Sequence, residues 1–238
     1  ALRQGVKWLF RKILPQYKLT YDTAKANKII ETYLKEGKTV FTEQDGNELL
    51  KCYGFNTLSM ALSKDTAQAC QIAGQIGYPV VMKIASKDIL HKTDAGGVVV
   101  GLEDGESVKS AFETIMEKAK AYNPDAQIDG VLIQKMAPKG KEVILGLSKD
   151  PVFGHAVMFG LGGIFVEVYK DVVFRLSPMG RNVARRMIKT IKGYPILKGL
   201  RGEKASDIET IEKHIVALKA MADNHPMIKE LDINPLFV

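Results

Sequence analysis

Hydrophobic residues recur along the chain with the period of amphipathic helices in some segments and with the density of buried strands in others. Residues 22–36 place four apolar side chains on one side of a helix, with Gly37 as its end, and these are Ile29, Ile30, Tyr33 and Leu34. The same reasoning predicts helices at residues 22–36, 42–52, 63–77, 106–121, 181–191 and 207–224, and strands at residues 57–61, 78–84, 97–102, 130–136, 142–147, 155–160, 172–176 and 228–234.

The order of these elements indicates the fold class. Helices and strands alternate without the regular βαβ rhythm of a doubly wound sheet, which predicts an α+β protein made of lobes. The 238 residues suffice for one large domain or two small lobes. We find no internal repeat and no low-complexity segment in the sequence.

The composition is that of a globular protein rather than of a membrane or secreted one. The chain is 46% hydrophobic and 26% charged, which is ordinary for a globular protein. No apolar run approaches the roughly 20 residues needed to span a bilayer, and the basic N-terminus lacks the features of a secretory signal. We therefore expect no membrane association and a cytoplasmic location, in which Cys52 and Cys70 stay unpaired.

The net charge of +7 raises the question of nucleic acid. The basic residues are spread along the chain and form no known nucleic-acid module. The densest group lies within residues 181–192 at helical spacing, which is typical of a solvated helix face. Nucleic-acid binding is therefore not expected, and bound nucleotide phosphates would account for part of the excess equally well.

A lysine interrupts the apolar strand at residues 78–84. Burying Lys83 is costly unless its ammonium group meets an anion, although an edge lysine can also extend to water. The connection that follows, residues 85–96, is rich in hydrogen-bond donors and runs into Gly96 and Gly97. Such a turn can close over phosphates because glycine lets backbone N–H groups approach oxygen atoms, but Gly-Gly hairpins are also common.

Two further segments have a composition suited to a nucleotide. Gln134, Lys135 and Met136 end a strand before a Pro-Gly break, where the backbone can pair with a purine edge. Glu142 follows and can accept hydrogen bonds from ribose hydroxyls, or it is simply a surface glutamate.

A glycine cluster includes Gly162 and Gly163, and it forms either a phosphate cradle or a tight turn. It is not a Walker loop, because no Gly-Lys-Ser/Thr sequence follows.

The last strand carries oxygen ligands. Glu230, Asp232 and Asn234 alternate along it and therefore share one face. Hard oxygen ligands suit Mg²⁺, which keeps several of its waters and takes few protein ligands. The alternative is the polar outer face of an edge strand, which Pro235 would favour.

Taken together, residues 77–98, 141–167, 193–203 and 230–235 resemble the β subunit of archaeal ADP-forming acetyl-CoA synthetases, which are relatives of succinyl-CoA synthetase. The similarity runs from about Tyr21 to the end of the chain. It implies an ATP-grasp fold with the nucleotide between two lobes, and a reversible reaction in which acid, ATP and CoA give acyl-CoA, ADP and phosphate.

The resemblance also implies roles for the residues. His91 would take part in handing a phosphoryl group between a phosphohistidine and the nucleotide, and Asp232 would be the second catalytic residue. Asp232 and Asn234 would hold Mg²⁺, with ATP or ADP as substrate. The nucleotide-binding residues would be Lys83, Lys92, Gly96, Gly97, Gln134, Lys135, Met136, Glu142, Gly162 and Gly163.

The resemblance divides the chain into residues 1–20, a basic extension or linker; residues 21–135, the first part of the ATP-grasp domain with its phosphate-binding lobe; and residues 136–238, the second lobe. Family members continue past the last strand to another acidic metal ligand, so we expect a C-terminally truncated lobe here.

The expected partner is a CoA-binding α subunit, or a fused domain, that carries the phosphorylated histidine and binds CoA and the carboxylic acid in a hetero-oligomer. A regulatory ATP-grasp module attached to an acyltransferase is the alternative. The loop around His91 disfavours a carboxylate–amine ligase.

Overall fold

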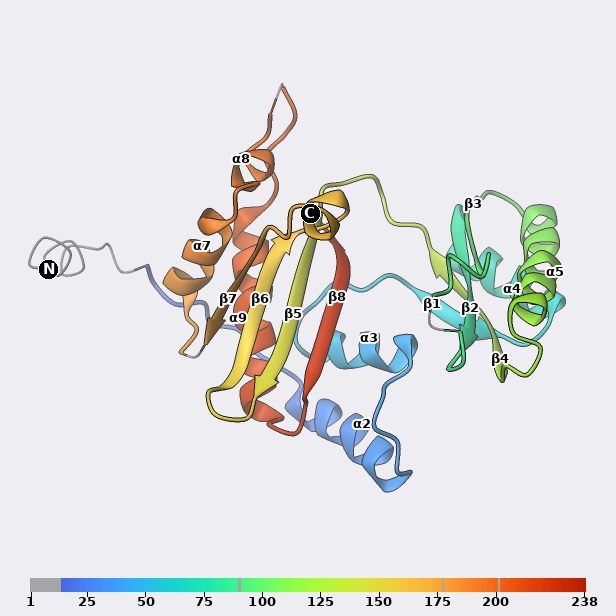
Figure 1. Ribbon diagram of the computed structural model, residues 1–238, viewed down its shortest axis with the longest axis horizontal. Coiled ribbons are helices and arrows are strands. Elements are labelled where there is room, and N and C mark those ends of the chain that lie inside the picture. The colour runs from blue at the N-terminus through green and yellow to red at the C-terminus, as the bar shows by residue number, and fades with distance from the viewer. Residues whose placement is uncertain (1–13, 90, 177, 201) are drawn as a thin grey trace, which may run out of the picture. The chain divides into compact units, whose positions relative to one another are not determined.

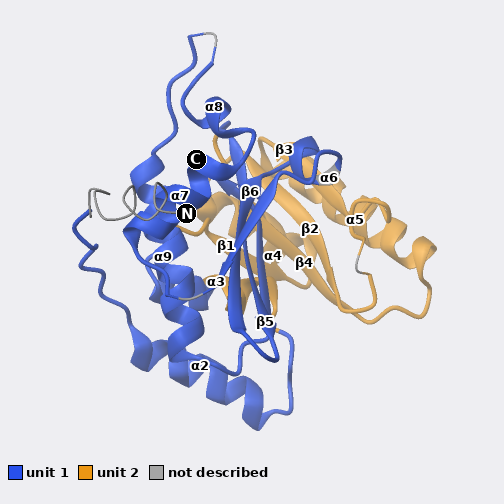
Figure 2. Cartoon of the chain, turned by 60° about the vertical axis from the view of Figure 1, so that its left-hand side comes forward, with its two compact units in different colours: residues 1–40, 48–55, 139–238 blue, residues 41–47, 56–138 orange. Residues whose placement is uncertain are grey.

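The computed structural model describes residues 14–89, 91–176, 178–200 and 202–238. Its helices and strands form two compact units (Figures 1 and 2). Unit 1 contains residues 1–40, 48–55 and 139–238, and unit 2 contains residues 41–47 and 56–138. Within the described ranges, no helix has both the length and the apolar character required to cross a membrane.

Unit 2 is a four-stranded antiparallel sheet in the order β1-β4-β2-β3, packed against two helices (Figure 1). Its elements are β1 (Met60–Ser63), α4 (Thr66–Ile76), β2 (Val80–Ser86), β3 (Val98–Leu102), α5 (Gly105–Tyr122) and β4 (Ile128–Lys135). Val80, Met82 and Ile84 alternate along β2 and are fully buried in the core that α4 and α5 share with the sheet. Lys83 therefore lies on the other face of the sheet, because successive strand residues point to opposite sides.

Unit 1 contains a second antiparallel sheet, in the order β7-β6-β5-β8, with α7 and α9 packed against it. Its elements are α2 (Thr23–Lys35), β5 (Glu142–Asp150), β6 (Gly154–Leu161), α6 (Ile164–Glu167), β7 (Val172–Leu176), α7 (Arg181–Thr190), α8 (Tyr194–Leu197), α9 (Ile208–Asn224) and β8 (Glu230–Phe237). Val157, Phe159 and Leu161 of β6 are buried, whereas Phe174 and Leu176 of β7 are about half exposed. One face of this sheet thus belongs to the core and the other stays accessible.

The two units are not separated by a single boundary in the sequence at residue 135, because each is built from more than one segment. The change of unit at residues 138–139 lies close to the predicted boundary, but α2 and the second half of α3 (Glu43–Cys52) belong with the C-terminal unit. The backbone N–H of Asp22 donates to the carbonyl oxygen of Cys52 at 2.9 Å. The Tyr53 hydroxyl contacts Nε2 of His225 at 2.8 Å. Such contacts join segments far apart in sequence, which a reading of local periodicity does not detect.

The predicted basic extension is partly described. Its residues 1–13 lie outside the described residues, and residues 14–20 run along unit 1. Gln16 accepts a hydrogen bond from the backbone N–H of Arg181 at 3.0 Å, at the start of α7, where Gly180 supplies no side-chain cap. Tyr17 donates to Glu212 at 2.7 Å. This segment therefore contributes to the packing of α7 and α9.

Several predicted boundaries differ from the structure by a few residues, and two of these differences have a local physical reason. The helix predicted to begin at Ser63 begins at Thr66, because Asp65 accepts the backbone N–H of Gln68 and Ser63 ends β1. The final strand runs through Pro235 to Phe237, which is possible because β8 is an edge strand and, among the described strands, pairs with β5 alone.

Two histidines are buried in unit 1. His225 is 1% exposed, next to Tyr53. His214 is 8% exposed and stacks on Phe55 with ring centroids 4.5 Å apart. Among the described residues, Nδ1 of His214 has no hydrogen-bond partner. Burial lowers the pKa of both imidazoles, since the charged form loses its hydration.

This burial predicts a loss of stability at mildly acidic pH. An unfolded histidine titrates near 6.5, and the folded pKa lies lower, so the unfolded state binds more protons as the pH falls. The free energy of unfolding should decrease from about pH 7.5 to about pH 5.5, by at most about 1.4 kcal/mol per pH unit for each histidine. Urea titrations measure this slope. His214→Phe keeps the stacked ring and should flatten it, and an unchanged slope would rule out His214 as a cause.

Candidate functional site

The loop between β2 and β3 is shaped by its own backbone. The N–H of Gly97 donates to the carbonyl of Lys92 at 2.7 Å, and the N–H of Ile84 donates to the carbonyl of Gly97 at 2.7 Å. A Cβ at Gly97 would lie 2.5 Å from Cγ2 of Ile84, and Gly96 has a φ of +63°. Both glycines are therefore required by the turn itself, whatever their predicted contact with phosphate.

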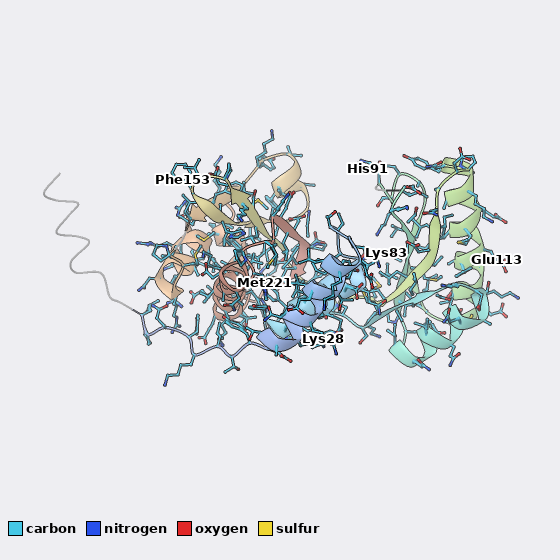
Figure 3. All side chains as sticks on the ribbon, turned by 90° about the horizontal axis from the view of Figure 1, so that it is seen from below. Lys28, Lys83, His91, Glu113, Phe153 and Met221 are labelled. Atoms are coloured by element: carbon cyan, nitrogen blue, oxygen red, sulfur yellow. The ribbon has the colours of Figure 1, made fainter. Side chains whose placement is uncertain are left out.

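The loop and the sheet form an open pocket of about 410 Å³ in unit 2. Its lining residues are Glu43, Lys83, His91, Lys92, Thr93, Asp94 and Val98. Three residues predicted from the sequence, namely Lys83, His91 and Lys92, thus line the same pocket. His91 is exposed, and Figure 3 labels Lys83 on its strand and His91 on the loop.

Glu43 was not predicted as a site residue. It begins α3, and its Oε1 lies 2.8 Å from Nζ of Lys83, while its Oε2 lies 3.6 Å from Nζ of Lys92. All three side chains are between one-quarter and about one-third exposed. The sequence offers only an acidic residue in the first turn of a helix, a common position, so no local signal would have linked Glu43 to Lys83.

Several polar groups of the predicted purine hinge at the end of β4 already form hydrogen bonds within unit 2. Nζ of Lys135 donates to the carbonyls of Gly77 and Tyr78 at 2.9 and 2.7 Å, at the end of α4. The backbone N–H of Met136 donates to the carbonyl of Pro79 at 3.1 Å. Gln134 is half-buried and lies opposite Val81 in the sheet. A nucleotide bound here would therefore contact polar groups of this segment other than the Lys135 ammonium and the Met136 N–H.

Unit 1 brings three other predicted residues together. The N–H of Gly162 donates to the carbonyl of Glu142 at 2.9 Å. A Cβ at Gly162 would lie 2.9 Å from Cβ of Glu142, and Gly163 has a φ of +58° at the start of α6. The glycine pair therefore makes a tight turn against Glu142.

Asp232 and Asn234 lie on the accessible face of the unit 1 sheet. Both are exposed, and Asp232 lies opposite Gly146 of β5, which in turn lies opposite Met158 of β6. The next position in this row is Phe174 of β7. An acidic edge thus adjoins an apolar surface, and the sequence had not predicted Met158 or Phe174 as part of it.

The electrostatics of this edge suit a divalent cation. Although Asp232 is exposed, neighbouring atoms remove part of the hydration of its carboxylate, and this desolvation together with the nearby Glu230 carboxylate raises the pKa of Asp232. A bound cation would therefore relieve an unfavourable negative charge. Among the described residues, no group of three His, Cys, Asp or Glu side chains is placed to hold a metal ion. An aspartate and an asparagine alone still fit Mg²⁺, which keeps waters and takes its remaining ligands from phosphates.

The two antiparallel sheets agree with the ATP-grasp fold that the sequence motifs predict. Residues 32–238 match the model of the ATP-grasp domain, and the chain belongs to this family. The chain is 49% identical over 214 residues to the β subunit of acetate–CoA ligase (ADP-forming) I from Pyrococcus furiosus, with 90% of this chain and 92% of that protein covered.

Solved structures agree with this assignment. Acetyl-coenzyme A synthetase 1 of Ca. Korarchaeum cryptofilum, in complex with coenzyme A, Ca-AMPCP and HgCl⁺, matches with a TM-score of 0.86 and 38% identity, covering 89% of this chain and 93% of that chain. Its complex with coenzyme A and Mg-AMPPCP, in which a phosphohistidine segment points towards the nucleotide binding site, matches with a TM-score of 0.78 and 35% identity, covering 89% and 92%. The predicted family and ATP-grasp fold are therefore confirmed.

Proposed function

We propose that this chain is the nucleotide-binding part of an ADP-forming acyl-CoA synthetase and that it works with a CoA-binding subunit or domain. The observation that carries the proposal is that Lys83, Lys92 and the exposed His91 line the same pocket. Two ammonium groups can bind phosphate oxygens there, while an accessible imidazole can accept a phosphoryl group.

In the proposed exchange, a neutral ring nitrogen of His91 attacks the phosphorus of the partner's phosphohistidine. The P–N bond to the partner breaks as the P–N bond to His91 forms. A β-phosphate oxygen of ADP then attacks the same phosphorus, which gives ATP and leaves His91 neutral. Lys83 and Lys92 bind phosphate oxygens during both transfers.

Asp232 and Asn234 are the residues that would hold Mg²⁺, which supplies charge neutralisation at the phosphates when bound. Glu142 and the Gly162–Gly163 turn are proposed to contact the nucleotide. Support comes from the relatives, since the Korarchaeum enzyme was solved with Mg-AMPPCP and the Pyrococcus relative is a β subunit.

The test is ATP formation from acetyl-CoA, ADP and phosphate, with the CoA-binding subunit from the same source supplied. The proposal expects ATP only when both chains are present. A chain that binds ADP but forms no ATP with that partner would instead favour a regulatory module.

Lys83→Ala should weaken binding of Mg-ADP. Loss of a charge-assisted contact costs about 2 kcal/mol, which is a roughly thirtyfold increase in Kd. Isothermal calorimetry measures this change. Lys28→Ala is the matched control, because Lys28 is exposed on α2 (Figure 3) and should leave the affinity unchanged. Equal affinities of wild type and Lys83→Ala would remove Lys83 from the site.

A further inference from the structure

The carboxylate of Glu43 contacts both lysines that the proposed function assigns to phosphate. Lys83 is 2.8 Å from one carboxylate oxygen and Lys92 is 3.6 Å from the other. The three groups line the same 410 Å³ pocket, together with Asp94. Two lysines and two acidic residues cancel, so the formal charge of the lining is zero with His91 neutral.

The start of α3 does not depend on this carboxylate. Thr42 accepts the backbone N–H of Asp45 at 3.1 Å and donates its hydroxyl to Asp45 at 2.7 Å. The Thr42 oxygen thereby satisfies one of the free N–H groups of the first turn, as a side-chain cap does. The side chain of Glu43 is therefore directed to the lysines rather than to its own helix.

The ion pairs of Glu43 with Lys83 and Lys92 are of a kind that a phosphate ligand can displace. Two ammonium groups at one pocket repel each other, and a carboxylate between them offsets the repulsion. The Lys83 side chain is 25% exposed, that of Lys92 32% and that of Glu43 35%, so solvent screens the pairs and each one is weak. Phosphate oxygens form stronger charge-assisted hydrogen bonds with the same ammonium groups.

We propose that Glu43 is the internal counter-anion of the phosphate site. It pairs with Lys83 and Lys92 when no phosphate is bound, and it competes with the phosphates of the nucleotide for both. This inference rests on the proposed function and adds to it a residue that limits affinity. Glu43 keeps the pocket near neutrality and so favours release of the nucleotide after phosphoryl transfer.

The experiment is calorimetric titration of Glu43→Gln with Mg-ADP. The substitution keeps the shape of the side chain and raises the formal charge of the pocket from zero to +1. The Kd for Mg-ADP should fall about fivefold, which corresponds to about 1 kcal/mol. Adenosine carries no phosphate, so its affinity should not change. Glu113→Gln is the matched control, because Glu113 is exposed on α5 (Figure 3) and the same loss of charge there should have no effect.

Each outcome decides the matter. Tighter binding of ADP, but not of adenosine, by Glu43→Gln alone supports the competition. Unchanged or weaker ADP binding overturns it, and equal weakening of ADP and adenosine assigns Glu43 a structural role. The comparison with Lys83→Ala separates the two proposals: if Lys83→Ala weakens ADP binding while Glu43→Gln does not tighten it, only the inference about Glu43 fails.

Discussion

Phosphoryl exchange between ATP and the CoA-binding partner should fall at least about a hundredfold when His91 is replaced by alanine. A covalent acceptor divides one transfer into two easier steps, and removing it leaves no group to carry the phosphoryl intermediate. Binding of Mg-ADP should persist, because Lys83 and Lys92 stay in place. Exchange of label between ATP and the phosphorylated partner measures the first effect, and calorimetry measures the second.

His91→Asn distinguishes the acceptor role from a hydrogen-bonding role. Asparagine can still donate a hydrogen bond to phosphate, but it cannot form the P–N bond. The proposal expects it to be as inactive as alanine, and near-normal exchange by His91→Asn would sink the acceptor role. His155→Asn is the control for the same chemical change, since His155 lies in β6 of unit 1 and contacts the carbonyl of Ile228.

Glu212→Gln should destabilise the chain by about 3 kcal/mol. Glu212 is fully buried on α9 and contacts Arg185 through both oxygens, Arg181 at 3.3 Å and Tyr17 at 2.7 Å. The pair with Glu212 raises the pKa of the Arg185 guanidinium, and burial together with the hydrogen bond to Glu212 raises the pKa of the Tyr17 phenol. Removing one partner of a buried ion pair leaves the opposite charges uncompensated, which costs about 3–5 kcal/mol.

Urea denaturation provides the measurement, and α9 provides the control. Glu209 lies one turn before Glu212 and pairs with Arg181 and Lys213, but its side chain is 54% exposed. Glu209→Gln should therefore cost less than about 1 kcal/mol. If both substitutions changed the free energy of unfolding equally, the buried network would not be the reason for the effect.

Much of the local structure follows from the sequence. The apolar strand with one lysine became β2, and the segment that begins at Gly97 became its antiparallel partner β3. Thr42, the first residue of the helix predicted at residues 42–52, caps α3, because a side-chain oxygen next to the free N–H groups of a first turn is favoured by purely local geometry. The prediction that began a helix at Ser63 was wrong, since Asp65, two residues on, offers the same kind of cap.

The candidate site was only partly accessible to sequence reasoning. Lys83, His91 and Lys92 are close in the chain and belong to one strand and its loop, so their common pocket follows from a hairpin. Glu43 precedes them by forty residues or more and reaches the lysines only through packing of the folded chain. For Lys135, a prediction from the strand position could not detect that its ammonium binds the carbonyls at the end of α4.

The sequence by itself determined most of the helices and strands, where glycine must turn the chain, and to which family the motifs belong. These properties depend on periodicity, capping and backbone sterics, which act over a few residues. Only the tertiary structure decided that β4 lies between β1 and β2. The same holds for the pairing of β8 with β5, which places Asp232 in a row with Met158 and Phe174. It also holds for the ion pair between Glu43 and Lys83. These arrangements join residues distant in the chain, and they arise from burial and from charge pairing in the assembled fold.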